Sequence, residues 1–469
     1  MKSKLASLFC CLIVLVSFSG CTKVTQLVKD NQPTKAELLA EINEEHQRWE
    51  AAPAADPTPY LRHYDDPADA QKYFDYVTDT YSEYDAAKEL SLEEAEEDVN
   101  YLFDAFYYDF AFYDYFGGHT VFDQAKAEIL QELQAKDNLT CKDLQEVLVK
   151  HLTFIKDGHF NINHNFPAEK EIPFFFRQVM FVKTDSGYQN ANGKVVASVD
   201  DHPDLDELFK RSISEQGYLV YYPVLLKPAP FDGTEWEKHT CDETLTVHYT
   251  DGSTDTLTAD TWSQYYKELP KDQNTDLRQT DGIPVFQFNS FDGSFLQEVN
   301  AAAAQMSDAA ISMLDLRSNV GGYEEVAHQW FNQYSRQRVF STGVRYSVLP
   351  ASLVASPSTS KTPRASNDNI LILLSGKCSA SCAEITLDLS YNLDNSLIIG
   401  ENTNGSMISN SGHIELPNSK CSVDMTFSTV YLTPDGSDYF EEMRGFSPDI
   451  WVPAKEAETL AAKLMENLK

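Results

Sequence analysis

The sequence predicts an α/β protein built on a mostly parallel sheet with crossover helices, preceded by a helical region and a β-rich middle region. Three patterns predict this order. Apolar residues recur at helical spacing between residues 90 and 155, short alternating stretches fill residues 165–280, and apolar strands alternate with helical patterns from residue 310 onward. Parallel strands need crossover connections, which are usually helices, so the third pattern indicates a series of β-α-β units.

The chain of 469 residues is long enough for two or three domains and a large core. Its apolar fraction of 42% is typical of a globular protein rather than a disordered one. The 37 basic and 72 acidic residues give a net charge of −35. Such a surface repels phosphate backbones, so the composition disfavours a nucleic-acid partner.

The N-terminus has the pattern of an export signal over residues 1–20. Lys2 and Lys4 precede an apolar stretch at residues 5–18, and Ser19-Gly20 lead into Cys21. The apolar stretch is too short to span a bilayer comfortably, which favours a signal peptide. A cysteine directly after Ser-Gly resembles a bacterial lipobox, in which Cys21 would be the acylated first residue. The alternative is an ordinary signal peptide with an accidental cysteine; both interpretations predict export.

Residues 21–64 are expected to form a lipid-anchored tether with one short helical stretch, and residues 65–156 an N-terminal helical domain. Ser91 and Glu94 have the spacing of a capping box. After this box, five apolar residues share one helical face: Val99, Leu102, Phe103, Phe106 and Phe110. We interpret this aromatic stripe as a packed face rather than a ligand platform. A further helix is predicted after Thr140, with Asp143 at its third position.

Residues 157–280 are predicted to be a β-rich region, beginning at the Asp157-Gly158 turn. Strands are expected at 194–200 and 244–258, the latter folded into a hairpin at Asp251-Gly252. Residues 281–455 are predicted to be the α/β core, with strands at 310–316, 370–374 and 396–400 and helices from about 323 and 381. A C-terminal helix is expected at residues 456–469.

Cysteine usage predicts neither a disulfide framework nor a metal site. Without the signal peptide and Cys21, an odd set of cysteines remains, which cannot pair completely: Cys141, Cys241, Cys378, Cys382 and Cys421. The sequence contains no Cys-x-x-Cys pair and no His-Glu-x-x-His motif. We therefore expect no metal ion and no cofactor.

One strand-to-helix turn contains two candidate nucleophiles, Ser379 and Ser381, just after the predicted strand at 370–374. A serine in the first helical turn is exposed, and the unpaired N–H groups there can stabilise an oxyanion. The competing interpretation is structural, because Ser381 and Glu384 also have the spacing of a capping box. This segment alone favours the cap.

A second strand end, at residues 315–322, carries Gly321-Gly322, and paired glycines let backbone N–H groups approach a ligand closely. Asp315 and Arg317 in the same segment are predicted to form a structural ion pair. His159 is one candidate base among 11 histidines. Composition and spacing alone predict an exported α/β protein with a candidate serine site.

Five segments, taken in order, resemble the tail-specific or C-terminal-processing serine peptidase family, including its tricorn-core relatives. They are Asp157-Gly158-His159, and residues 313–322, 381–384, 400–405 and 442–452, with the sequences MLDLRSNVGG, SCAE, GENTNG and EMRGFSPDIWV. The resemblance covers about residues 90–455. It implies a ClpP/crotonase-like protease core for the α/β fold.

The resemblance also implies roles for individual residues. Ser381 corresponds to the nucleophile, while His159 and Glu442 correspond to the histidine and acidic residue of the tricorn-like branch. The backbone N–H of Cys382 would form the oxyanion hole with that of Gly321 or Gly322. The processing branch has a lysine 25 residues after its nucleophile, and here Ser406 occupies that position.

The chain departs from the family at two further positions. Phe160 replaces the usual threonine after His159, and Gly158 stands where the tricorn-like branch often has a hydroxyl residue. The middle region would correspond to a PDZ module, although only residues 193–203 show a partial likeness to one.

The sequence therefore predicts an exported, lipid-anchored serine endopeptidase that acts on peptides or on unfolded and tail segments of proteins. Its expected location is the bacterial cell envelope, on the outer membrane facing the periplasm. Two other classes remain open: a catalytically inactive peptide- or ligand-binding lipoprotein on the same fold, and a scaffold lipoprotein. Substrate identity, cleavage preference and oligomeric state also stay open.

Overall fold

The computed structural model describes residues 25–51, 58, 61–73, 75–231, 237–270, 272–342, 344–347, 364–407, 409–432 and 442–468. The predicted signal peptide and Cys21 lie outside these residues. Within the described ranges, no helix combines the length and apolar character that crossing a membrane requires.

A six-stranded sheet forms the core and confirms the predicted α/β class. Its order is β12 (Thr275–Thr280), β13 (Ile283–Phe288), β14 (Ile311–Asp315), β16 (Ile370–Ser375), β17 (Ser396–Gly400) and β20 (Ile450–Trp451). Only the β12–β13 pair is antiparallel. Every residue of β16 and of β17 is buried. Such continuous apolar strands are typical of a parallel sheet covered on both faces.

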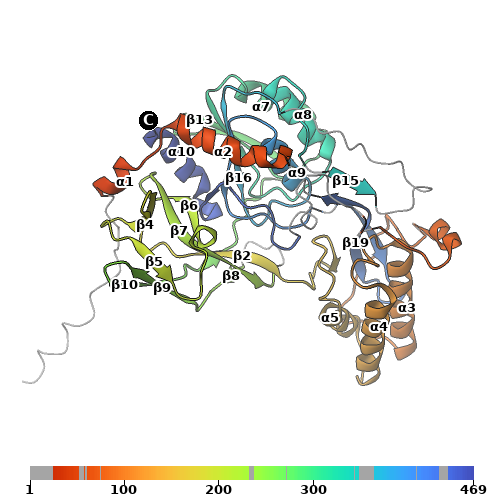
Figure 1. The fold of residues 1–469 in the computed structure, drawn as a ribbon. Helices are drawn as coiled ribbons and strands as arrows, with labels where there is room; N and C mark the ends of the chain where they lie inside the picture. Colours follow the sequence, from red (N-terminus) through yellow and green to blue (C-terminus); the bar gives the residue numbers. More distant parts are fainter. Residues whose placement is uncertain are drawn as a thin grey trace, which may run out of the picture.

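Helices cover both faces of this sheet (Figure 1). Leu371 and Leu373 of β16 belong to a cluster with α7 (Leu296–Met306), α8 (Glu324–Ser335) and α9 (Cys382–Tyr391). The alternate residues Ile372 and Leu374 pack in a second cluster with α10 (Ala457–Asn467). Side chains of a strand alternate between faces, so β16 contributes to both layers of the core. Short 3-10 turns, η3 (Gly293–Phe295) and η4 (Ala454–Glu456), precede α7 and α10.

The N-terminal segment packs on the core, whereas the sequence led us to expect a tether over residues 21–64. It forms α1 (Gln26–Asp30) and α2 (Lys35–Ala51), whose residues Val28, Leu38 and Ile42 are fully buried. His46 of α2 also lies 2.9 Å from the Asp449 carboxylate. Burying three aliphatic side chains contributes roughly 1.5–3 kcal/mol each. The described part of this segment is therefore held on the core.

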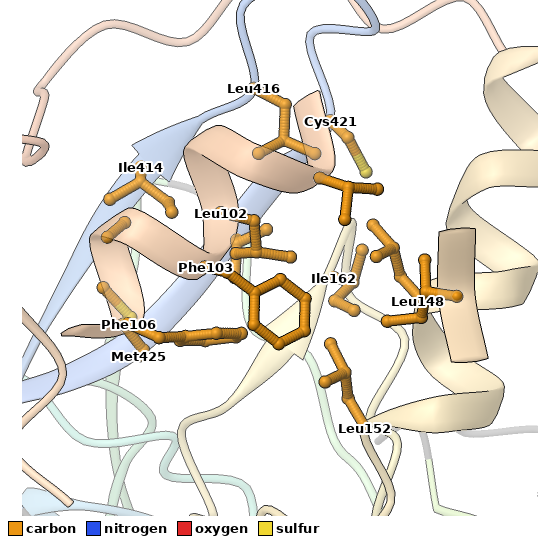
Figure 2. Packing of buried hydrophobic residues seen from close by; sticks show 14 of the residues in the cluster. Leu102, Phe103, Phe106, Leu148, Leu152, Ile162, Ile414, Leu416, Cys421 and Met425 are labelled. Carbon is orange, nitrogen blue, oxygen red and sulfur yellow. The ribbon is translucent and has the colours of Figure 1, made fainter. Parts of the chain in front are cut away.

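The helical region contains η2 (Pro67–Lys72), α3 (Leu92–Asp109), α4 (Gly118–Gln134) and α5 (Cys141–His151). The capping box predicted at Ser91 and the helix start predicted after Thr140 are confirmed, and Thr140 also forms a capping box with Asp143. The predicted aromatic stripe is buried, and it packs on β18 (Ser409–Glu415) and β19 (Ser422–Leu432) through Ile414, Leu416 and Met425 (Figure 2). These two strands belong to a sheet with β1 (Asn161–Ile162) and β15 (Val344–Ser347). The helical region is thereby joined to strands from the second half of the chain.

The middle region is a set of antiparallel sheets. Its elements are β2 (Lys170–Phe175), β3 (Phe181–Thr184), β4 (Gly187–Asn190), β5 (Val196–Val199), α6 (Leu205–Leu208), β6 (Phe209–Ile213), β7 (Leu219–Ala229), β8 (Lys238–His239), β9 (Thr244–Tyr249), β10 (Thr254–Thr258) and β11 (Trp262–Ser263). The predicted hairpin at Asp251-Gly252 is confirmed as β9–β10. Strand β2 ends the path β2-β7-β3-β4 and lies beside the core, where Glu171 N–H donates to Met443 O at 2.9 Å.

Candidate active site

Ser381 lies between strand β16 and helix α9 in a backbone conformation that serine rarely adopts. Its φ is +54° and its ψ is −117°, outside the usual regions for a residue with a Cβ atom. Strain of this kind costs about 1–3 kcal/mol and is concentrated at functional sites. Two hydrogen bonds hold it here: Ala380 N–H donates to Asn319 O at 3.0 Å, and Ser381 N–H donates to Glu384 Oε2 at 3.1 Å.

The neighbouring Ser379 has a structural role. Its side chain is fully buried, its hydroxyl donates to Leu316 O at 2.8 Å, and its oxygen accepts from Gly376 N–H at 3.1 Å. By contrast, Ser381 is partly exposed. Of the two serines in this turn, only Ser381 is therefore placed to meet a substrate.

The Gly321-Gly322 turn lies directly against Ser381. A Cβ atom at Gly321 would come within 2.7 Å of the Ser381 Cβ, and both glycines have positive φ angles, +103° and +130°. Gly321 N–H donates to Asn319 Oδ1 at 2.8 Å, so this N–H is already used within the fold. Gly322 is exposed, and among the described residues its N–H donates no hydrogen bond. Of the two predicted glycines, Gly322 is the better candidate donor to an oxyanion, beside Cys382 at the start of α9.

Asp315 and Arg317, at the start of the same segment, form the predicted ion pair. Arg317 Nη2 lies 2.6 Å from Asp315 Oδ2, and both side chains are buried. Glu458 of α10 completes the cluster at 2.8 Å from the same guanidinium. This cluster joins the end of β14 to helix α10.

His159 follows the buried Asp157 in a turn between α5 and β1. Its side chain is 15% exposed, and its Nδ1 lies 4.0 Å from Asp157 Oδ1. Within the described structure this nitrogen has no hydrogen-bond partner. Asp157 instead accepts the N–H groups of His159 at 2.9 Å and of Thr426 at 3.1 Å. Strand β19 thus supports the turn that presents the imidazole.

Glu442 contacts the same turn through the backbone. Its Oε2 accepts Gly158 N–H at 2.8 Å, and its Oε1 accepts Met407 N–H at 2.5 Å. Both of these Glu442 contacts are made to backbone N–H groups, one of them in the turn directly before His159. Catalytic hydrogen bonds are often long before substrate binds and tighten in the complex.

Glu384 connects the separate parts of the site. This carboxylate is fully buried. Its Oε2 accepts the N–H groups of Ser381 at 3.1 Å and Ser406 at 2.8 Å, and its Oε1 accepts Gly405 N–H at 2.8 Å and the Thr403 hydroxyl at 2.5 Å. The sequence predicted Glu384 as a partner in a helix cap and as part of the segment that resembles the nucleophile motif. In the structure it also organises the loop that follows β17.

Lys170, at the start of β2, lies at the centre of this arrangement and was missed by sequence reasoning. Its side chain is 1% exposed, and its Nζ donates to Ser406 Oγ at 2.9 Å, to Gly158 O at 3.3 Å and to Asn404 Oδ1. Burial lowers the pKa of Lys170 to about 8, although Glu442 and Glu384 oppose that shift. Ser406, the position of the processing branch's lysine, thus contacts an amine from another strand.

A second buried lysine, Lys377, belongs to the turn between β16 and α9 that carries Ser381. Its Nζ donates to Thr403 O at 2.5 Å and to the carbonyls of Asn404 and Arg444, both at 3.4 Å. Burial, together with the nearby charge of Lys170, lowers the pKa of Lys377 to about 7. Its partners are all backbone carbonyls, so its role is to hold the loop.

The surroundings of His159 favour its neutral form. Burial lowers the pKa of this imidazole; Asp157 opposes the shift and Lys170 adds to it. A neutral imidazole can accept a proton from a serine hydroxyl, so the environment suits a general base. Among the described residues, no group of three or more His, Cys, Asp or Glu side chains is arranged to hold a metal ion.

Residues 282–452 match a family model described as peptidase family S41. No curated protein gives a significant match to the chain. Three similar solved structures are mature CPAF (12% identity, 80% of this chain and 96% of the other, TM-score 0.43), the photosystem II D1 C-terminal processing protease (13%, 80% and 97%, 0.36) and the tricorn protease (10%, 81% and 37%, 0.39).

Proposed function

The chain belongs to peptidase family S41 through residues 282–452 and is a serine-type peptidase, and from this premise we propose an exported, lipid-anchored endopeptidase. It hydrolyses peptide bonds in peptides or in unfolded and tail segments of proteins through an acyl-enzyme. Ser381 is the nucleophile, His159 the base, and Glu442 the acidic residue that holds the histidine turn. The observation that carries this proposal is the strained Ser381 backbone beside the glycine turn.

In the proposed reaction the Ser381 oxygen attacks the substrate carbonyl while its proton passes to His159. The N–H groups of Cys382 and Gly322 stabilise the negative charge on the carbonyl oxygen. His159 then gives its proton to the leaving amine as the C–N bond breaks. A water molecule, deprotonated by the same imidazole, releases the acyl group and restores the serine.

Glu442 acts on His159 through the backbone of the preceding residue. Its carboxylate accepts Gly158 N–H at 2.8 Å, one residue before the imidazole. This bond supports a positioning role for Glu442, because it fixes the turn before His159 relative to the loop that contains Ser406.

Export and anchoring rest on the N-terminal pattern of Lys2, Lys4, the apolar stretch and Cys21. We place the acylated protein on the outer membrane of a bacterial envelope, facing the periplasm. Expression in a bacterial host with labelled palmitate tests this part. The wild type should be labelled and fractionate with membranes, whereas a Cys21→Ala variant should carry no label. A soluble, unlabelled mature wild type would refute the anchor.

Activity is tested with a fluorophosphonate probe, which reacts with activated serines. The wild type should be labelled at Ser381, identified by peptide mass, and should cleave an unfolded protein such as reduced, alkylated casein. Ser381→Ala should lose both activities. A folded wild type that neither reacts nor cleaves, yet binds peptides, would favour the inactive binding lipoprotein instead.

A further inference from the structure

We propose that Lys170 is a positioning residue of this site. Its ammonium group holds the His159 turn against the loop that follows β17, and Glu384 links that loop to Ser381. The inference rests on the proposed function. It concerns a residue outside the family's matched segment, contributed by strand β2 of the middle region.

The acceptors of the Lys170 amine belong to two different segments. Gly158 O lies in the turn directly before His159, whereas Ser406 Oγ and Asn404 Oδ1 lie in the loop after β17. The Ser406 hydroxyl itself donates to Gly158 O at 2.9 Å. The Gly158 carbonyl oxygen therefore accepts hydrogen bonds from both Lys170 and Ser406, and these bonds hold the turn that carries His159.

The contact between the two segments leaves no spare room. A Cβ atom at Gly158 would lie 2.1 Å from Gly405 O and 2.6 Å from Ser406 Oγ. On its other side, the loop is held by Glu384 Oε2, which accepts both Ser406 N–H and Ser381 N–H. A continuous chain of contacts therefore runs from Lys170 through Ser406 and Glu384 to the nucleophile.

The charge of Lys170 has a second consequence for His159. The acidic groups facing the lysine are Glu442, Glu384 and Asp157, and those facing the histidine are Asp157 and Asp424. Lys377 adds another buried cation near Lys170. Lys170 is the cation that acts on the imidazole, and a nearby positive charge disfavours its protonated form. Removing this charge should raise the pKa of His159.

The test measures the rate of fluorophosphonate labelling at Ser381 against pH, which requires no known substrate. Lys170→Met keeps much of the side-chain length and removes the charge, and Ser406→Ala removes one contact and keeps the charge. Lys183→Met is the matched control, because Lys183 lies on β3, pairs with Asp206 at 2.7 Å and is 48% exposed. Thermal midpoints are recorded for all variants.

We expect Lys170→Met to react about 100-fold more slowly at pH 7, with its acidic limb moved upward by about one pH unit. Ser406→Ala should react several-fold more slowly with an unmoved limb, and Lys183→Met should equal the wild type. If the acidic limb of Lys170→Met lies at the same pH as that of the wild type, and only the thermal midpoint is lower, Lys170 has a purely structural role. That result would overturn the proposal.

If Lys170→Met does not fold, Ser406→Ala decides: a wild-type rate there would overturn the positioning role. Labelling that persists in Ser381→Ala would instead refute the proposed function. The two failures are thus distinguishable.

Discussion

Ser381 and Ser406 donate their backbone N–H groups to the same oxygen atom, Oε2 of Glu384, at 3.1 and 2.8 Å. The first serine begins helix α9, and the second lies in the loop that packs on the His159 turn. One buried carboxylate therefore fixes the distance between the segment of the nucleophile and the segment that supports the base. A buried carboxylate that accepts hydrogen bonds from several donors is costly to disturb.

Glu384→Gln should abolish most activity and lower the free energy of unfolding by about 3 kcal/mol. The amide keeps one acceptor oxygen but turns N–H groups toward donors that the carboxylate satisfied. Urea unfolding and fluorophosphonate labelling measure the two effects. Glu325→Gln on the exposed side of α8 is the control and should change neither. A fully active Glu384→Gln enzyme would contradict the linking role.

Ser379→Ala and Ser381→Ala should separate stability from chemistry. Ser379 makes two buried hydrogen bonds, so its loss should cost about 1–3 kcal/mol of unfolding free energy while labelling at Ser381 continues. Ser381→Ala should lose labelling and keep most of its stability. If Ser379→Ala is the unreactive but folded variant, the nucleophile has been assigned two residues too late.

The acidic limb of the reaction should lie below pH 6.5. Burial lowers the pKa of His159, so the imidazole loses its proton, and becomes a base, at a lower pH than an exposed histidine. Labelling rates between pH 4.5 and 8 locate this limb. His159→Ala should lose nearly all reactivity across the range; a reactive His159→Ala protein would exclude histidine as the base.

Lys377 should make the wild type more stable as pH rises above neutrality. Its pKa is about 7 in the folded protein and near 10.5 when unfolded. Between these values the unfolded chain binds more protons at this residue, so unfolding free energy increases with pH. Relative to Lys377→Met, the wild type should gain on the order of 2–3 kcal/mol between pH 7 and 9.5 in urea titrations. Parallel pH profiles would show that Lys377 does not titrate in this range.

The elements of the core could be predicted because their local signals agree with their environment. Strands β14, β16 and β17 are short, mostly apolar segments, and Ser91 and Thr140 mark helix starts by side chains that cap them. Packing between distant segments left no such signal. Leu38 and Ile42 are buried in a cluster with residues of the sheet and α10, which lie far away in sequence. Strands β18 and β19 pack on the N-terminal helices, and no pattern in their own sequence indicates this contact.

The candidate site divides in the same way. Ser381, Glu384 and the glycine turn lie in short segments, and the spacing of residues within each segment predicts its local structure. Lys170 stands 211 positions before Ser381 at the head of an aromatic strand, and nothing near it in sequence indicates a buried amine. The choice between Gly321 and Gly322 required the hydrogen bond from Gly321 N–H to Asn319.

The packed segment α1–α2 has a geometric consequence for the proposed anchor. The buried Val28 stands only seven positions after Cys21 along the chain. A fully extended chain spans at most about 3.6 Å per residue, so the segment from Cys21 to Val28 can be no longer than roughly 25 Å. An enzyme acylated at Cys21 would then be confined to a thin layer beside the bilayer. Its accessible substrates would be chains that come to the membrane surface, rather than those at large in the surrounding compartment.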